Sequence, residues 1–283
     1  MHGLRRRTAG GAALAALCLT LASGCGGDTK DPVASSDSKS YGTGKLTIGI
    51  SFDQPGIGLK TSKGYEGFDV STAKYVAHKL GVSTKNITWV EAKPADREKL
   101  ITSGKVDMVV SSYSITDERK KQVAFAGPYF EAHQDLLVRR NDTDIRGPKT
   151  LNGRTLCSVT GTTSAQLVEK KYKGRITLKK YPEFSDCVKA LKDGGIDAVT
   201  TDDVILAGFA AQKKYKGDFK VVGDGFSDEE YGIGLKKGDT QMLDKVNAAL
   251  TSYVKDGLWK KALQAYVSPS GYSLPDAPTP GKG

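Results

Sequence analysis

The feature that most constrains the fold of this 283-residue chain is a weak internal repeat. Residues 103–110, with the sequence SGKVDMVV, resemble residues 193–200, with the sequence DGGIDAVT, at an offset of 90 positions. Each segment follows a helical pattern, contains a glycine suited to a helix end, and continues into a run typical of a strand. Residues 46–49 and 156–159 correspond at an offset of 110. We therefore expect two successive strand–helix–strand–helix–strand units.

The repeat predicts an α/β fold with two lobes, each on a mostly parallel sheet, because strands that alternate with helices pair in parallel. The first unit carries about 20 extra residues, 52–68, between its first strand and its first helix. Such sheets bind ligands beyond the carboxyl ends of their strands, so two facing lobes would form a cleft. After Tyr231, a strand at 232–235 and helices at 241–254 and 258–266 are expected to pack back on the first lobe.

The N-terminal 24 residues have the features of an export signal. Three arginines, Arg5 to Arg7, precede an uncharged run at 9–22, which is too short to span a bilayer. The sequence LASGC, which ends at Cys25, resembles the lipobox of bacterial lipoproteins. We expect export, removal of residues 1–24, and lipid anchoring through Cys25 on the outer face of the cytoplasmic membrane. The alternative is an ordinary secretory signal in which Cys25 is incidental.

Apart from Cys18 in the signal and Cys25 as the expected lipid site, the chain has two cysteines, Cys157 and Cys187, and neither has a CxxC partner for zinc or redox chemistry. An oxidising compartment favours a disulfide between them. The closed loop of about 30 residues corresponds to roughly 3–4 kcal/mol of chain entropy. The alternative is two buried, inert thiols.

Charge and motif content argue against several classes of function. The 42 basic and 32 acidic residues give a formal net charge of +10, but the basic residues are spread without a basic–aromatic motif, which disfavours a nucleic-acid partner. The three histidines, His2, His78 and His133, lack metal-ligand spacing, and the chain has neither a GxSxG elbow nor a phosphate-binding loop. We therefore expect no catalysis, no metal and no cofactor.

Residues 111–119, with the sequence SSYSITDER, favour recognition of an anion. Thr116 can cap a helix that starts here, which places Arg119 in its first turn. A positive charge there opposes the helix dipole, and a guanidinium fork fits a carboxylate. The alternative is a solvated surface arginine.

Two further places complete a pattern suited to a small zwitterion. Gly161, Thr162 and Thr163 precede a helix, where free N–H groups and hydroxyls attract anions; the alternative is plain capping. Asp202 follows a strand of the second unit and could hold an ammonium group; the alternative is a cap for the next helix.

Six short motifs occur in order along residues 44–267: GFDV at 67–70, SYSIT with Arg119, PY at 128–129, GTT at 161–163, DAV with Asp202, and YGI at 231–233. Together they resemble the polar amino-acid family (family 3) of extracytoplasmic solute-binding proteins, which serve ATP-binding-cassette importers. The resemblance implies a two-lobed periplasmic-binding-protein type II fold. Its two crossing strands would lie near residues 136–139 and 231–235, and closure on ligand would present a surface to a membrane permease.

The resemblance also implies roles for individual residues. Arg119 would grip the α-carboxylate of an amino acid, with donors from Gly161, Thr162 and Thr163. Asp202 would hold the α-ammonium, so that each charge is countered inside a dry cleft.

Further contacts are implied from the first lobe. Ser112, Tyr113 and Ser114 would contribute polar contacts, and Phe52 is the nearest match to an aromatic that covers the ligand. The segment FDQPGIGLK, which begins at Phe52, resembles that of glutamate-binding lipoproteins from high-GC Gram-positive bacteria. Lys60 at its end could meet a side-chain carboxylate; the alternative is a solvated lysine.

Our hypothesis is therefore a glutamate-binding protein, with aspartate, glutamine or another polar amino acid as alternatives. A second alternative is a cyclohexadienyl-dehydratase-like enzyme on the same fold. We expect a monomer with this organisation: signal peptide 1–24, flexible tether 25–43, lobe 1 at 44–135 and 231–268, lobe 2 at 136–230, and flexible tail 269–283.

Overall fold

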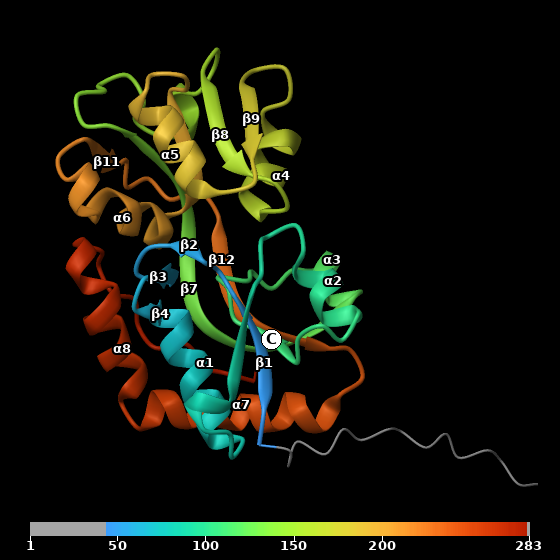
Figure 1. Ribbon diagram of the computed structural model, residues 1–283. Coiled ribbons are helices and arrows are strands. Elements are labelled where there is room, and N and C mark those ends of the chain that lie inside the picture. The colour runs from blue at the N-terminus through green and yellow to red at the C-terminus, as the bar shows by residue number, and fades with distance from the viewer. Residues whose placement is uncertain (1–43, 282–283) are drawn as a thin grey trace, which may run out of the picture. The chain divides into compact units, whose positions relative to one another are not determined.

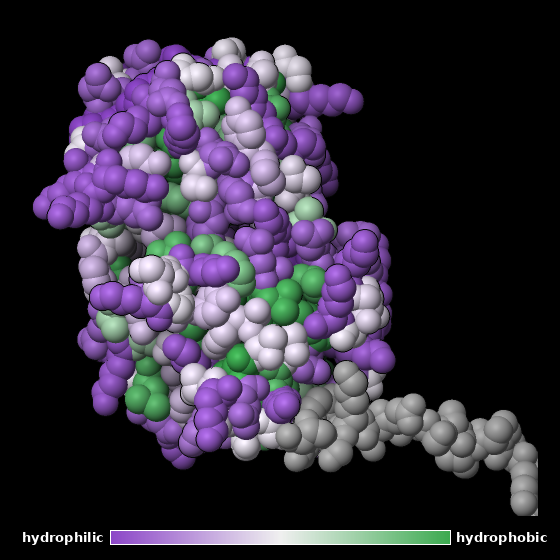
Figure 2. Space-filling view, viewed as in Figure 1, coloured by the Kyte–Doolittle hydropathy of each residue, from purple (hydrophilic) through white to green (hydrophobic). Residues whose placement is uncertain are grey.

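Figure 1 shows the protein as a computed structural model, which describes residues 44–281. The expected signal peptide, the tether and the expected lipid site at Cys25 lie outside the described residues. Within residues 44–281 no helix has the length and apolarity needed to cross a membrane. Figure 2 shows a mainly hydrophilic face, and the large apolar side chains that stay exposed in this part of the chain are Leu258 and Tyr266.

Nine strands of the described residues form one continuous sheet. Its centre is a long antiparallel pair, β7 (Val123–Arg139) and β12 (Asp228–Lys236). The strands that follow β12 are β6 (Met108–Val109), β1 (Leu46–Ile50) and β5 (Ile87–Glu91). Those that follow β7 are β10 (Ala198–Asp202), β8 (Thr155–Val159) and β9 (Thr177–Tyr181), with β11 (Phe219–Val221) also paired to β7.

This strand order produces two lobes. In lobe 1, β1 pairs in parallel with β5 and β6, and in lobe 2, β8 pairs in parallel with β9 and β10. Strand β7 exchanges β12 for β10 between His133 and Gln134, so that β7 and β12 pass between the lobes in Figure 1. The predicted α/β fold with two crossing strands is confirmed. The crossings were expected at residues 136–139 and 231–235, which lie to either side of them. Residues 136–139 pair with β10 and β11 within lobe 2, and residues 231–235 pair with β6 and the first part of β7 within lobe 1.

Helices cover the sheet of each lobe. The α-helices of residues 44–281 are α1 (Phe68–Lys79), α2 (Arg97–Thr102), α3 (Asp117–Lys120), α4 (Thr163–Lys171), α5 (Phe184–Lys192), α6 (Asp203–Ala211), α7 (Thr240–Lys255) and α8 (Leu258–Tyr266). Short 3-10 helices are η2 (Thr84–Asn86), η3 (Pro148–Thr150), η4 (Lys213–Tyr215) and η5 (Ser268–Ser270). Both α7 and α8 contact α1, so the two C-terminal helices lie on lobe 1.

The extra residues of lobe 1 form a separate antiparallel sheet of three short strands. These are β2 (Asp53–Gln54), β3 (Gly58–Thr61) and β4 (Gly64–Glu66). Strand β2 contacts α5 and α6 of lobe 2. The insertion therefore places a piece of lobe 1 on the interface between the lobes.

The predicted disulfide is present. Cys157 of β8 and Cys187 of α5 are bonded, with their Cα atoms 5.6 Å apart, and both are fully buried. The bond fixes α5 against the first strand of lobe 2. Its sequence separation of 30 corresponds to roughly 3–4 kcal/mol of loop-closure entropy.

The C-terminal segment, for which a flexible tail is expected, makes specific contacts. The Tyr272 hydroxyl donates to Asp203 Oδ2 at 3.1 Å, and the Tyr272 ring centroid lies 6.4 Å from that of Phe130. Further on, the Gly281 amide donates to the Gly127 carbonyl at 2.8 Å. The segment thus contacts the start of α6 in lobe 2 as well as the long strand β7.

Candidate functional site

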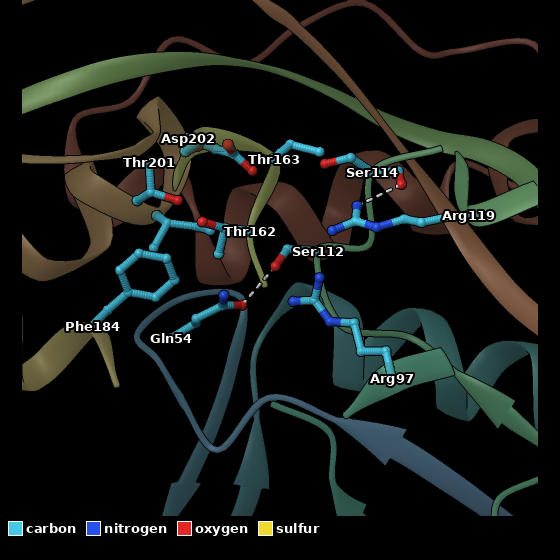
Figure 3. Close-up of a pocket in the computed structure, with 12 residues that line it drawn as sticks. Gln54, Arg97, Ser112, Ser114, Arg119, Thr162, Thr163, Phe184, Thr201 and Asp202 are labelled. Carbon is cyan, nitrogen blue, oxygen red and sulfur yellow. Dashed lines mark hydrogen bonds between the residues drawn. The ribbon is translucent and has the colours of Figure 1, made fainter. Parts of the chain in front are cut away.

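A pocket with about 240 Å³ of empty space lies between the lobes, beyond the carboxyl ends of β6, β8 and β10. Lobe 1 contributes Gln54, Arg97, Ser112, Ser114 and Arg119. Lobe 2 contributes Thr162, Thr163, Ser164, Phe184, Thr201, Asp202 and Ile205. Figure 3 shows the two guanidinium groups pointing into the space opposite Asp202 and Thr162.

Arg119 lies in the short helix α3, where hydrogen bonds hold both its backbone amide and its guanidinium. The Thr116 hydroxyl caps α3 by accepting from the Arg119 amide at 3.2 Å. The Arg119 guanidinium donates from Nη1 to the Ser114 carbonyl at 2.8 Å and from Nη2 to the Gly161 carbonyl at 3.0 Å. Its Nε lies 3.4 Å from Glu98 Oε1. Because a guanidinium has five N–H donors, one on each Nη stays available for a ligand.

Arg97 is a second buried cation at the same pocket. It is the first residue of α2 and is only 3% exposed. The guanidinium carbons of Arg97 and Arg119 lie 5.1 and 5.0 Å from the centroid of the Tyr113 ring. Burial, with the charge of Arg119, lowers the pKa of Arg97 to about 10. Within residues 44–281, Arg97 forms no salt bridge, and its buried Nε has no hydrogen-bond partner. Two buried guanidinium groups at one pocket therefore favour the binding of an anion there.

Ser112 is held in an unusual backbone conformation, with φ at 41°. Its amide donates to Asp69 Oδ2 at 2.7 Å, and the other oxygen of that carboxyl accepts from the Tyr129 hydroxyl at 2.8 Å. Burial raises the pKa of Asp69 to about 6. The Ser112 hydroxyl in turn donates to Gln54 Oε1 at 3.0 Å, which places both side chains at the pocket. The buried carboxyl of Asp69 thus offsets the strain at Ser112.

The N-terminus of α4 supplies donors from lobe 2. The Thr162 hydroxyl caps this helix by accepting from the Ala165 amide at 3.0 Å, so the capping interpretation holds for Thr162. The Thr163 hydroxyl donates to Glu229 Oε2 at 2.9 Å. The buried Ser164 hydroxyl has no partner within residues 44–281, and it lines the pocket. A small anion would find free backbone N–H groups and this hydroxyl at one place.

Asp202 places a buried carboxyl group at the site. It is 4% exposed and accepts a hydrogen bond from the Tyr231 hydroxyl. It occupies the N-cap position of α6 without a side-chain cap bond, so the capping alternative does not hold for its carboxyl. Burial above all, reinforced by the nearby Glu229, raises the pKa of Asp202 to about 8. A ligand ammonium beside it would lower that pKa by pairing with the carboxylate.

The structure gathers six of the ten predicted ligand-binding residues at the pocket: Arg119, Asp202, Thr162, Thr163, Ser112 and Ser114. Tyr113 lies behind the two arginines, and Gly161 contributes its carbonyl to Arg119. Phe52 lines a neighbouring hollow, and exposed Lys60 has its Nζ 5.2 Å from the Phe52 ring centroid. Lys60 pairs with Tyr65 of β4 in the small sheet and does not line the pocket.

Six lining residues were not among the predicted ligand contacts: Gln54, Arg97, Ser164, Phe184, Thr201 and Ile205. Arg97 carries the same signal that marked Arg119, an arginine in the first turn of a helix. Phe184, at the start of α5, is the aromatic that lines the pocket where Phe52 was expected.

Metal-binding and histidine chemistry find no support at this pocket. Among residues 44–281 no group of three potential metal ligands comes together. His133 lies 3.6 Å from Asp203 and 3.5 Å from Asp228. His133 and Asp203 line a different hollow, and no histidine lines this pocket.

Comparisons with known proteins agree with this geometry. Residues 46–269 match the profile of the bacterial extracellular solute-binding proteins, family 3. The glutamate-binding protein GluB of Corynebacterium glutamicum is 43% identical over 231 residues, which cover 78% of this chain and 77% of that protein. An ancestral arginine-binding protein bound to arginine superimposes with a TM-score of 0.73 at 36% identity, over 79% of this chain and 98% of that one. The ancestral amino acid-binding protein AncCDT-1, a precursor of cyclohexadienyl dehydratase, gives 0.71 at 30% identity, over 79% and 95% of the two chains.

Proposed function

Because this chain belongs to the bacterial extracellular solute-binding proteins of family 3, we propose that it captures glutamate between its lobes and delivers it to an ATP-binding-cassette importer. The observation that carries the choice of glutamate is the pair of buried arginines, Arg97 and Arg119, at one pocket. Both lobes of one chain supply the residues that line the pocket, and we propose that the monomer is the functional unit.

The charges of the site match those of an acidic amino acid. Arg119, with its two unused Nη donors, would hold the α-carboxylate together with the N-terminus of α4. Asp202 would hold the α-ammonium. A second carboxylate on the ligand would then neutralise Arg97, whose burial without an anion is otherwise costly.

The relatives support this choice over an enzymatic one. GluB, at 43% identity, is named as a glutamate-binding protein. AncCDT-1 is described as an amino acid-binding protein, although its descendant is a dehydratase. In the proposed function, the pKa of Asp202 is raised because its carboxyl is buried without the ligand's ammonium group, and Asp202 does not act as a general acid.

Replacing Arg97 by glutamine is expected to reduce the affinity for glutamate roughly 10- to 100-fold, the worth of one charge-assisted hydrogen-bonded contact. The affinity for glutamine should change less than about threefold, since its amide brings no charge to Arg97. Isothermal titration of both ligands against both proteins measures the four affinities. The fold should persist, because Arg97 forms no salt bridge within residues 44–281.

Lys60→Gln is the matched control, because it removes an exposed cation of the same lobe. Its affinity for glutamate should equal that of the unaltered protein. An equal loss of affinity for glutamate and glutamine in Arg97→Gln would show that Arg97 does not recognise the charge of the ligand's side chain. A loss of glutamate affinity in Lys60→Gln alone would assign recognition of the side-chain carboxylate to Lys60.

We also propose that the protein is exported and anchored through a lipid on Cys25. The support is the order of arginines, apolar run and LASGC sequence at the N-terminus. In detergent phase partitioning of expressing cells, the unaltered protein is expected in the detergent phase, since acyl chains hold it to membranes. Cys25→Ser should move it to the aqueous phase, whereas Cys18→Ser should not. An unaltered protein found wholly in the aqueous phase would contradict the anchor.

A further inference from the structure

The β2 segment, residues 53–55 of the lobe 1 insertion, touches lobe 2 without supplying the main ligand contacts. Gln54 alone of the three lines the pocket, while the residues on either side of it face α5 and α6.

Asp53 completes a helix that belongs to the other lobe. The N-cap residue of α5, Glu183, forms no side-chain cap bond. Instead Asp53 Oδ2 accepts a hydrogen bond from the Ser185 amide at 2.9 Å. First-turn amides have no partner within their own helix, so this donor is satisfied only while the lobes are together. A carboxylate also complements the positive end of the α5 dipole.

An ion pair lies next to this contact. Lys93 of lobe 1 pairs with Glu183, and both side chains are partly buried. Lys93, Glu183 and Asp53 surround the same hollow beside the ligand pocket. The interface therefore carries two polar connections between the lobes at one edge of the pocket.

Pro55 rests on a helix position that only glycine fits. A Cβ on Gly208 of α6 would lie 2.1 Å from the Pro55 carbonyl oxygen. Glycine inside a helix is unfavourable by about 1 kcal/mol relative to alanine. The close approach of Pro55 accounts for its presence in α6, and that approach exists only with the lobes together.

We propose that residues 53–55 form a latch that holds the two lobes closed over a bound ligand, with Asp53 capping α5 and Pro55 seated on Gly208. The latch controls the dissociation rate of the ligand and not the choice of ligand. The inference deepens the proposed function, since it concerns the release of the same ligand. Asp53, Pro55 and Gly208 are positioning residues, because none of them lines the pocket.

The experiment measures glutamate association and dissociation rates by stopped-flow fluorescence. Asp53→Ala should speed dissociation roughly 3- to 30-fold, the range for a lost cap. Gly208→Ala should speed it roughly 5- to 100-fold, as expected for overpacking. Association should stay within about twofold, since an open pocket receives the ligand before the latch forms.

Two controls match these variants. Gly195→Ala adds a methyl in lobe 2 where the nearest contact is an ordinary 3.6 Å, and Lys63→Ala removes an exposed side chain from the same insertion. Neither should change the dissociation rate. Unchanged dissociation in both Asp53→Ala and Gly208→Ala would overturn the latch.

A second readout uses the protein saturated with the amino acid that calorimetry shows to bind, because the latch forms over a bound ligand. Hydrogen exchange of the Ser185 amide reports the Asp53 contact directly, because that amide has no partner in its own helix. It should be protected in the unaltered protein and exchange at least about tenfold faster in Asp53→Ala. Equal exchange in the two proteins would also overturn the latch. If the amino acid that binds is not glutamate, the proposed function is contradicted, but the exchange result still tests the latch.

Discussion

Replacement of Arg119 by alanine is expected to weaken binding of every amino acid roughly 100- to 1000-fold, the cost of removing one partner of a buried charge pair. Arg119 is the residue whose free Nη donors face the pocket from lobe 1. Since every amino acid carries an α-carboxylate, the loss should not depend on the side chain. Isothermal titration with glutamate, aspartate and glutamine measures it.

Arg119→Lys is the informative partner variant. It retains the charge but loses the planar fork, so we expect an intermediate loss of roughly 10-fold or more. Circular dichroism and thermal unfolding should show an intact fold in both variants, because Arg119 is not part of the apolar core. Affinity retained in Arg119→Ala, with the fold intact, would contradict the role proposed for this arginine.

Asp202→Asn is expected to have opposite effects on binding and on stability. Loss of the carboxylate leaves the ligand ammonium buried without a counter-charge, which should weaken binding roughly 100-fold or more. The folded pKa of about 8 lies above the ordinary 3.8, so the stability linked to this carboxyl is fully present below pH 3.8 and is lost as pH rises through 8. Asparagine removes that penalty, and the ligand-free variant should unfold at a higher temperature at neutral pH.

The same pKa predicts the pH dependence of binding. Only ionised Asp202 can pair with an ammonium, so affinity should rise with pH by up to about tenfold per unit until pH 8 and then level. Titrations between about pH 6.5 and 8.5 stay above the pKa values of about 6 for Asp53 and Asp69, which separates these groups. Asp202→Asn should show no such slope. A flat profile in the unaltered protein would mean that Asp202 is already ionised before the ligand binds.

The two-lobed fold could be predicted from sequence because its signals are local and repeated. The repeat at an offset of 90 marks equivalent strands, β6 and β10, in the two lobes. Ser112 and Asp202 follow or end those strands, so the order of the elements is enough to place them at a common edge. The disulfide could be expected because Cys157 and Cys187 are the two cysteines that remain once Cys18 is assigned to the signal and Cys25 to the lipid.

Contacts between the lobes could not be predicted in this way. Arg97 is in a polar segment that suggests an exposed helix start, and only its packing against Tyr113 shows that it is buried. The role of Asp53 depends on the approach of α5 from a segment 132 positions away. Phe52 and Lys60 were expected at the pocket from the family resemblance of their segment, but they belong to the small sheet and its approach, and neither lines the pocket.

The most direct test of the account is calorimetric titration of the protein against a panel of amino acids at pH 8, where Asp202 is at its pKa. The panel should include glutamate, aspartate, glutamine, arginine and histidine. We expect micromolar or tighter binding of glutamate, with glutamine weaker by roughly tenfold or more because it cannot neutralise Arg97. Micromolar binding of arginine or histidine with none of glutamate would contradict it.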